Sequence, residues 1–379
     1  MRYVDEFRDV KAAAGIVSAI RAVRLAGPVT FMEVCGSHTM AISRSGIRSL
    51  LPDTVRLVSG PGCPVCVTPT RHLDHALALS RIPGVTITTF GDLLRVPGSE
   101  TSLERERACG ADIRVVYSTL DALAMARREP DRNFVFLGVG FETTAPTVAA
   151  ALLQADQEGL ANFSVLSDHK VMPPPMRALM EAPDVKVRGF ICPGHVSTVI
   201  GSGAYRFLAD DYGASCVVAG FEPLDVLQAL LMLVHQAAES RAEVENAYGR
   251  AVTPDGNPAA KGLLDRVFQP IDATWRGFGV IPASGLSIRP EFAHLDASLL
   301  FDVAVPESRD DPACRCADVL RGTATPPECP LFARRCTPEE PRGACMVSSE
   351  GTCAAYYRFE RRRDRAEGRA NSATSPKAS

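Results

Sequence analysis

The chain has 379 residues, of which 46% are hydrophobic and 22% charged, and its formal net charge at pH 7 is −3. This length exceeds what one hydrophobic core usually serves, so we expect two or three domains. The slightly negative charge argues against a nucleic-acid partner, which needs a basic face, and no apolar run approaches the roughly 18 residues of a membrane span.

Residues 1–23 have the pattern of an amphipathic helix. Acidic and basic side chains are mixed from the start, so the basic-then-apolar order of a secretory signal peptide is missing. The twelve cysteines occur in a chain much larger than the small secreted domains that disulfides stabilise. We therefore expect a cytoplasmic protein whose cysteines serve metal or redox chemistry.

Five short hydrophobic runs follow, and each ends in a glycine- or proline-rich loop that precedes a helical pattern. The runs cover residues 29–34, 55–60, 133–140, 187–191 and 215–220. Strands that alternate with helices predict parallel sheets with helices on both faces. We predict an α/β fold with two such domains, a smaller C-terminal domain of helices and loops, and a disordered tail. The approximate boundaries, which allow the domains to interleave, are 1–130, 131–240, 241–358 and 359–379.

The chemically distinctive side chains lie at the ends of these strands. In open α/β sheets, ligands bind beyond the carboxyl ends of the strands, so several such loops are expected to meet at one cleft. The candidates are Cys35, His38, Cys63, Cys66, Glu142, Thr143, Cys192 and His195. Two further cysteines are expected to be ordinary, Cys109 in a charged loop and Cys216 in a buried strand.

Cys63 and Cys66 form a C-x-x-C pair within GPGCPVCVTP, where a helix is expected to begin. The positive end of a helix dipole favours thiolate, and the neighbouring prolines hold the two sulfurs near each other. A redox dithiol is favoured over half a zinc site, because the sequence contains no second C-x-x-C pair. Cys35, followed by Gly36 and His38, stays open between a nucleophile, a metal ligand and a buried inert thiol.

The pattern changes from about residue 240. Residues 275–292 contain several glycines and prolines and the only tryptophan, and we expect them to form a connecting segment. Six cysteines then crowd into forty residues, and four of them have the spacing C-x14-C-x6-C-x16-C: Cys314, Cys329, Cys336 and Cys353. Long, proline-stiffened loops suit a [4Fe–4S] cluster, whereas zinc sites more often use tight C-x-x-C pairs. Spacing alone does not decide which four bind, since Cys316 and Cys345 are also available.

With these motifs assembled, the chain resembles the HypD family of [NiFe] hydrogenase maturation factors. The matching stretches are EVCGSHTMAISRSGIRSLLP, GPGCPVCVTP, GFETTAPT, ICPGHVSTVIG, VVAGFEPLDVLQ, WRGFGVIPASGL, PPECPLF and CTPEEPRGACMVSSEGTCAAYY. They run from about residue 29 to 358, and no motif cysteine departs from the family pattern. The resemblance covers nearly the whole chain.

The resemblance implies a fold of two α/β domains with a third, iron–sulfur domain, and a role in building the Fe(CN)₂CO unit of the hydrogenase active site. It implies that Cys35 binds this iron and that Cys63 and Cys66 are a redox dithiol. The cluster ligands would be Cys314, Cys329, Cys336 and Cys353, with Cys316 and Cys345 as non-ligands. An iron–sulfur cluster beside a dithiol is similar to the arrangement in ferredoxin–thioredoxin reductase, and it would supply electrons through disulfide exchange.

Four further residues are candidates to orient or hydrogen-bond the diatomic ligands of the iron, with helix capping or loop shaping as the alternative. They are His38, Glu142, Thr143 and His195. The implied partners are a small HypC-type chaperone that shares the iron, a HypE-type protein that delivers cyanide as a thiocyanate, and the hydrogenase large-subunit precursor. A stand-alone [4Fe–4S] disulfide reductase and a structural zinc protein are the alternatives. Whether such a scaffold turns over as an enzyme stays open.

Overall fold

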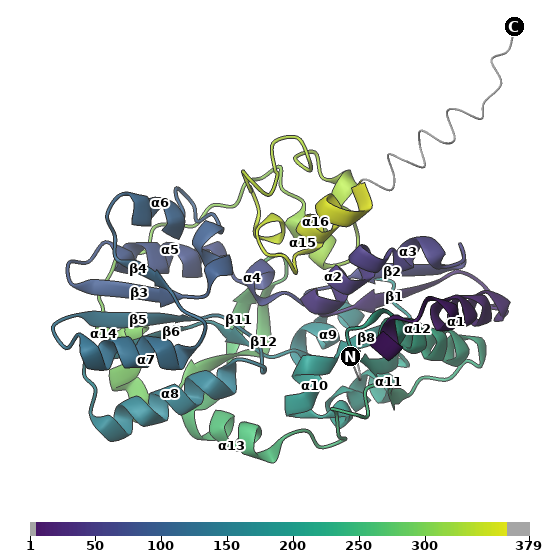
Figure 1. The fold of residues 1–379 in the computed structure, drawn as a ribbon, viewed down its shortest axis with the longest axis horizontal. Helices are drawn as coiled ribbons and strands as arrows, with labels where there is room; N and C mark the ends of the chain where they lie inside the picture. Colours follow the sequence, from purple (N-terminus) through teal and green to yellow (C-terminus); the bar gives the residue numbers. More distant parts are fainter. Residues whose placement is uncertain (1–4, 362–379) are drawn as a thin grey trace, which may run out of the picture.

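Two parallel β-sheets form two lobes that lie side by side in the computed structural model, which describes residues 5–361 (Figure 1). Sheet A has the strand order β10-β9-β8-β1-β2 and sheet B the order β4-β3-β5-β6, and every pairing in both is parallel. Sheet A consists of β1 (Val29–Glu33), β2 (Val55–Ser59), β8 (Gly189–Pro193), β9 (Ser215–Ala219) and β10 (Val244–Asn246). Sheet B consists of β3 (Val85–Thr89), β4 (Ile113–Val115), β5 (Asn133–Gly138) and β6 (Phe163–Ser167).

Helices cover both faces of sheet A. Successive side chains of a strand point to opposite faces, so Phe31 of β1 packs in a different cluster of buried residues from Met32. The cluster of Phe31 includes residues of α1 (Val10–Ala22), α2 (Gly36–Ser45) and α12 (Pro223–Ala238). The cluster of Met32 includes residues of α9 (Pro173–Glu181) and α11 (Arg206–Tyr212). The predicted α/β architecture, with parallel sheets between helices, is confirmed in sheet A.

Sheet B is covered in the same way. Phe134 and Phe136 of β5 pack with α7 (Thr119–Arg128) and α8 (Ala145–Glu158), while Val135 and Leu137 face α5 (Thr70–Ser80). Ser118 caps α7 through a reciprocal capping box with Asp121, which fixes where this helix begins. The cluster that contains Val135 also contains Met32 of sheet A, so one hydrophobic core joins the two lobes.

A third, antiparallel sheet lies between the lobes, where the sequence had indicated only a connector (Figure 1). It consists of β11 (Phe268–Trp275), β12 (Gly279–Ile288) and β7 (His169–Lys170). Trp275 is buried, its Nε1 donates a hydrogen bond of 2.8 Å to Ser284 Oγ, and its ring stacks on Phe141 at 5.9 Å. Glycine and proline are tolerated at the edges and bulges of antiparallel strands, which is why this segment did not have the pattern of a strand.

The two lobes are interleaved along the chain, an arrangement that the sequence had left open. Sheet A takes strands from residues 29–59 and 189–246, and sheet B takes its strands from residues 85–167, which lie between them. Residue 130, where the first domain was expected to end, lies between α7 and β5, and both of these elements belong to the lobe of sheet B.

The remaining helices before residue 301 are α3 (Ile47–Leu50), α4 (Pro64–Val67), α6 (Leu103–Ala108), α10 (Gly194–Ile200), α13 (Pro258–Val267) and α14 (Ala297–Leu300), with 3₁₀ turns η1 (Asp5–Arg8), η2 (Gly91–Arg95), η3 (Ser202–Tyr205) and η4 (Pro290–Leu295).

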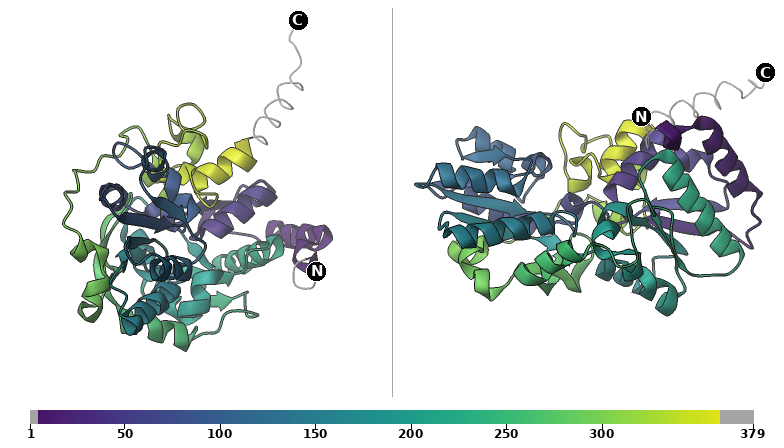
Figure 2. Two further views of the ribbon diagram at one scale, coloured as in Figure 1. Left: turned by 60° about the vertical axis from the view of Figure 1, so that its left-hand side comes forward. Right: turned by 60° about the horizontal axis from the view of Figure 1, so that its bottom comes forward.

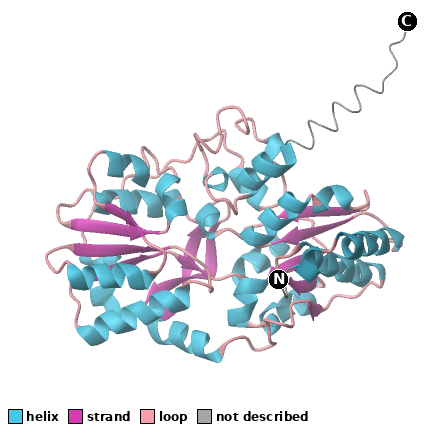
Figure 3. Ribbon diagram, viewed as in Figure 1, coloured by secondary structure: helices cyan, strands magenta, loops and turns pink. Residues whose placement is uncertain are grey.

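Residues 301–361 form a segment, mostly loop, that lies over the junction of the two lobes (Figures 2 and 3). Its short elements are α15 (Cys316–Leu320), η5 (Pro326–Glu328), η6 (Ala344–Met346), α16 (Thr352–Ala355) and a π-helical turn, η7 (Tyr356–Glu360). Glu360 accepts a hydrogen bond of 2.5 Å from Ser43 Oγ of α2, which ties the end of this segment to sheet A. The predicted disordered tail, apart from its first three residues, lies outside the described residues.

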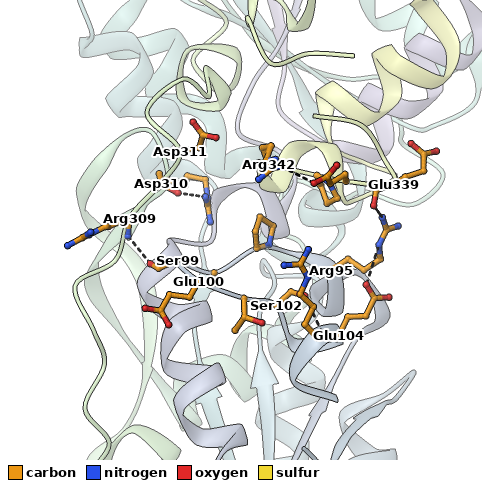
Figure 4. Close-up of a pocket in the computed structure, with 17 residues that line it drawn as sticks. Arg95, Ser99, Glu100, Ser102, Glu104, Arg309, Asp310, Asp311, Glu339 and Arg342 are labelled. Atoms are coloured by element: carbon orange, nitrogen blue, oxygen red, sulfur yellow. Dashed lines mark hydrogen bonds and ion pairs between the residues drawn. The ribbon is translucent and has the colours of Figure 1, made fainter. Parts of the chain in front are cut away.

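A polar cleft of about 390 Å³ marks where this segment meets the lobe of sheet B (Figure 4). Asp310 accepts hydrogen bonds of 2.6 Å from Arg276 Nη1 and from Thr70 Oγ1, and the Arg309 N–H donates to Ser99 Oγ at 2.8 Å. These contacts fix the C-terminal segment both to the turn between β11 and β12, which carries Arg276, and to the lobe of sheet B. The lining residues of the polar cleft include no cysteine.

Candidate functional site

A cleft of about 350 Å³ lies where the strand-to-helix loops of both sheets meet the C-terminal segment. Its lining includes Cys35, Cys63, Thr143, His195 and Glu350. We call it the central cleft. Cys35 follows β1, Cys63 follows β2, Thr143 follows β5 and His195 follows β8, so parallel strands deliver these residues from their carboxyl ends. Four of the residues that the sequence singled out thus lie together.

Cys35 is the N-cap residue of α2 and is buried. Its backbone N–H donates a hydrogen bond of 3.1 Å to Glu33 Oε2, and the other oxygen of Glu33 accepts one of 2.5 Å from Thr39 Oγ1. Burial raises the pKa of the Cys35 thiol to about 12, because the thiolate is poorly solvated, while backbone N–H groups of α2 oppose the shift. The thiol is therefore neutral at pH 7 unless a cation replaces its proton.

The C-x-x-C pair lies on the short helix α4, which Cys63 caps and Pro64 begins. The Cys66 N–H donates to Cys63 Sγ at 3.3 Å, and the two sulfurs are 2.6 Å apart. Cys63 lines the central cleft, whereas Cys66 is fully buried behind it. Burial raises the pKa of the Cys66 thiol well above its ordinary value. This asymmetry gives Cys63 the access to ligands in the cleft.

The loops that carry Cys35 and Cys63 touch through their main chains. The Gly36 N–H donates a hydrogen bond of 3.0 Å to the carbonyl oxygen of Gly62. A Cβ atom added at Gly62 would lie 2.1 Å from the nitrogen of Cys35, so only glycine permits this approach. The backbone itself therefore holds the lone cysteine beside the C-x-x-C pair.

His38 and Glu142 are candidates that the structure does not bring into the lining of the central cleft. His38 Nε2 lies 2.8 Å from the carbonyl oxygen of Gly220, and its ring stacks on Phe221. Glu142 is buried and accepts a hydrogen bond of 2.9 Å from the N–H of Met172. The contacts of both side chains are those of residues that shape loops.

His195 lines the central cleft, and Phe221 packs against its ring. Their rings stack with centroids 3.9 Å apart, and Phe221 is also stacked on His38, so one phenyl ring separates the two imidazoles. Burial lowers the pKa of His195, while the negative charge of Glu350 opposes that shift. His195 therefore contributes a neutral imidazole to the lining of the cleft.

The six C-terminal cysteines converge on one small cavity. Its volume is about 10 Å³, and its lining includes Cys314, Cys316, Cys329, Cys336, Cys345 and Cys353. We call it the cysteine cavity. No histidine or carboxylate lines it, so its donor set is entirely sulfur. Iron–sulfur clusters are held by four cysteine thiolates, and the chemistry of this donor set fits such a group. Room for a cluster requires the thiols to spread apart, and no three metal-binding side chains among residues 5–361 already have the geometry of a single-ion site.

Sulfur contacts connect the cysteine cavity to the central cleft. The thiol of Cys66 lies near that of Cys345, Cys345 Sγ lies 2.9 Å from Cys316 Sγ, and Cys316 in turn neighbours Cys314. A path of neighbouring thiols thus runs from Cys63 and Cys66 to the cavity. Cys192 and Cys216 form a separate contact inside sheet A, and Cys109 is exposed at the end of α6.

The comparisons with known proteins identify the family. The model of a family described as "HypD: Hydrogenase formation hypA family" matches residues 11–360. The chain belongs to the HypD family. It is 50% identical to "Hydrogenase maturation factor HypD" of Rhizobium leguminosarum bv. viciae, over 96% of this chain and 97% of that protein. It is 44% identical to "Hydrogenase maturation factor HypD" of Escherichia coli (strain K12), over 97% and 100%, respectively.

The HypD match includes every residue that lines the central cleft and the cysteine cavity. The resemblance that the motifs had indicated is thus confirmed at the level of the family. In the part of the chain that the structure describes, no helix combines the length and apolarity that crossing a bilayer requires.

In this HypD chain, sequence reasoning missed two acidic residues of the central cleft, Asp92 and Glu350, and two cysteines of the sulfur path. Glu350 reaches the cleft from the C-terminal segment, where Ser37 Oγ donates a hydrogen bond of 2.5 Å to its Oε1. Its sequence, SSEGTC, has no pattern that would place it beside α2. Cys316 and Cys345 had been set aside as surplus to four ligands, yet they lie where the cysteine cavity meets Cys66.

Proposed function

We propose that this chain is a maturation factor of [NiFe] hydrogenases, in which the central cleft holds the iron that becomes the Fe(CN)₂CO unit. The observation that carries the proposal is the convergence of Cys35 and Cys63 on one cleft, with sulfur contacts that lead on to the cysteine cavity. The names of the two relatives, at 50% and 44% identity, support hydrogenase maturation as its role.

Cys35 is the residue that we propose holds the iron. Iron that carries cyanide and carbon monoxide is a soft metal centre, which thiolate ligands hold well. Because the pKa of the Cys35 thiol is raised to about 12, binding must displace the proton. His195 and Glu350 line the same cleft and are positioned to accept it. Thr143, which is exposed in this lining, is the candidate to hydrogen-bond a ligand of the iron.

Cys63 and Cys66 supply the electrons for cyanide transfer from a thiocyanate. Cys63, which faces the cleft, attacks the thiocyanate sulfur, the S–C bond breaks, and cyanide leaves to the iron with the bonding electron pair. Cys66 then attacks the resulting mixed disulfide and releases the donor thiol. In total the two cysteines lose two electrons and two protons and become a disulfide. One proton stays on the donor thiol and the other leaves to a base in the cleft.

The Cys63–Cys66 disulfide must then be reduced for another transfer. A [4Fe–4S] cluster held by Cys314, Cys329, Cys336 and Cys353 would supply single electrons when bound. Cys345 and Cys316 lie between those ligands and Cys66, so thiol–disulfide exchange along this path can return the pair to its reduced form. Two electrons and two protons restore both thiols.

The proposed partners follow from the same chemistry. A small HypC-type chaperone would share the iron, a HypE-type protein would deliver the thiocyanate, and the hydrogenase large-subunit precursor would receive the finished unit. The cytoplasm, where thiols are kept reduced, is the compartment that suits this cycle. The alternative of a stand-alone disulfide reductase finds no support in the names of the relatives.

Infrared spectroscopy of the chain, purified anaerobically with its small chaperone, tests the proposal. We expect cyanide and carbonyl stretching bands, and we expect them to be absent from a Cys35→Ala variant that still binds the chaperone. Cys109→Ala is the matched control, because that exposed thiol lies away from the cleft, and its bands should be unchanged. Bands that persist in Cys35→Ala would show that the iron is held elsewhere.

A further inference from the structure

We propose that an acidic one-electron carrier protein docks at the outer wall of the cysteine cavity and delivers electrons there. The inference rests on the proposed function, since it assumes a cluster in that cavity. An outer cleft of about 550 Å³ lies on this wall, and its lining includes Cys329, Phe332, Arg334, Tyr356 and Arg361. None of these residues lines the central cleft.

The outer cleft and the cysteine cavity share part of their walls. Cys329 and Phe332 line both, so a single layer of side chains separates a carrier in the outer cleft from the proposed cluster ligands. The inner side of the cavity is different, because there Cys345 contacts the buried Cys66. Electrons that enter beside Cys329 would therefore have a short path to a cluster held in the cavity, and the side of the cavity toward the C-x-x-C pair would be their exit.

The surface around the outer cleft carries unpaired positive charge. Arg334, Arg335 and Arg358 are exposed, and together with Arg361 they have no acidic side chain within ion-pair distance among residues 5–361. Arg361 instead lies over the ring of Tyr357, at 4.7 Å from its centroid. The C-terminal segment thus presents four arginines whose charges are available to a partner.

The acidic residue of the outer cleft, Glu328, is already engaged. Its Oε2 accepts hydrogen bonds of 2.6 and 2.7 Å from the backbone N–H and the hydroxyl of Thr325. The positive charges of Arg315 and Arg56 act on Glu328 as well, and they help to lower the pKa of its carboxyl. Glu328 stays ionised, but Arg334 and Arg361 in the same lining outnumber it. The outer cleft therefore has a net positive charge, which attracts an acidic protein and speeds its approach.

The shape and composition of the surface fit a transient partner. Electron-transfer encounters use small interfaces, and Phe332 and Tyr356 provide an aromatic centre within a charged rim. With a cluster bound, each encounter would move one electron from the carrier, which would be oxidised, to the cluster, which would be reduced. Two encounters and two protons from solvent reduce one Cys63–Cys66 disulfide.

Stopped-flow reduction of the cluster-loaded chain by a reduced plant-type [2Fe–2S] ferredoxin tests the docking site. We expect the second-order rate constant at low ionic strength to fall at least tenfold in the double variant Arg334→Glu/Arg335→Glu. The difference should shrink as salt screens the charges. The matched control, Arg24→Glu/Arg128→Glu, changes the net charge equally but alters arginines on α7 and beyond α1, and it should stay within twofold of the unmodified chain.

Two further measurements separate the possible failures. The affinity of oxidised ferredoxin for the chain, measured calorimetrically, should weaken at least tenfold in the Arg334→Glu/Arg335→Glu variant alone. Dithionite should reduce the cluster equally fast in all three proteins. An intact cluster whose reduction by ferredoxin is the same in both double variants would overturn the docking site and leave the proposed function standing. A purified chain without iron and sulfide would overturn both.

Discussion

At the scale of single residues, burial controls which groups are charged. Cys35 has a pKa raised to about 12 and His38 one lowered to about 4, and in both cases loss of solvation is the largest cause. Both groups are therefore neutral at pH 7 in the absence of a ligand. A cleft that disfavours free thiolate keeps Cys35 resistant to oxidation until a metal binds.

Glu142 offers a measurable consequence of the same effect. Burial raises its pKa to about 7, and only one of its oxygens has a hydrogen-bond partner among the described residues. Between about pH 4.5 and 7 the folded chain keeps this proton and the unfolded chain loses it, so stability falls as the pH rises. The loss contributed by Glu142 reaches about 3 kcal/mol above pH 7.

The Glu142→Gln variant should remove this dependence, because its amide oxygen can still accept from Met172 and no charge is buried. We expect the variant to gain in urea midpoint over the unmodified chain at pH 8, and to show little gain at pH 5. Anaerobic urea unfolding at the two pH values measures the difference. An equal difference at both values would mean that Glu142 keeps an ordinary pKa.

Residue-level prediction from the sequence was accurate where the main chain decides position. One cleft is lined by Cys35, Cys63, Thr143 and His195 because each of them follows a parallel strand. The sequence indicates these strands through its alternation of hydrophobic runs and helical patterns. His38 turned instead toward Gly220, since the position of a residue in a loop does not fix the direction of its side chain. The pattern of the strands contains no information about that choice.

At the scale of elements, the contact between the Cys35 and Cys63 loops depends on glycine. The backbone hydrogen bond from Gly36 to Gly62 holds the beginnings of α2 and α4 next to each other beside the cleft. We expect Gly62→Ala to lower the free energy of unfolding by roughly 3 kcal/mol. The new Cβ would clash with main-chain atoms of Cys35, and a main chain moves aside less readily than a flexible side chain does. The thermal midpoint of the purified chain measures the loss.

Gly15→Ala is the control for this substitution. Gly15 lies within α1, and a Cβ atom there has no neighbour within 4 Å. Alanine should stabilise that helix by roughly 0.5–1 kcal/mol, so its midpoint should rise. A Gly62→Ala variant that melts with the unmodified chain and retains its infrared bands would contradict the close approach of the two loops.

The elements also show where sequence patterns stop being informative. The five hydrophobic runs expected as strands are β1, β2, β5, β8 and β9, and a helix follows each of them as expected. The β11–β12 hairpin was wrongly interpreted as a connector, because its glycines and prolines hide the strand pattern. Gly285 is required there by packing, since a Cβ would lie 2.6 Å from Ala273 Cβ on the facing strand. That requirement comes from a cross-strand neighbour, which a local pattern does not reveal.

At the scale of the whole molecule, the site is assembled from segments that are far apart in the chain. Ser37 and Glu350 are hydrogen-bonded although they lie 313 positions apart, and three strands of sheet A follow all the strands of sheet B along the chain. The α/β class and the meeting of strand-end loops follow from alternating local patterns. The interleaving of lobes and the sulfur path from Cys66 to Cys345 follow from long-range packing, for which a single sequence carries no periodic signal.

The most direct test is the oxidation state of Cys63 and Cys66 after cyanide transfer. The chain, with iron and its chaperone but without external reductant, is mixed with a HypE-type thiocyanate donor. Mass spectrometry of the alkylated peptides counts disulfides, and infrared bands count the cyanide on iron. The account predicts one Cys63–Cys66 disulfide for each cyanide transferred. Cyanide on the iron while both thiols remain fully alkylated would contradict it.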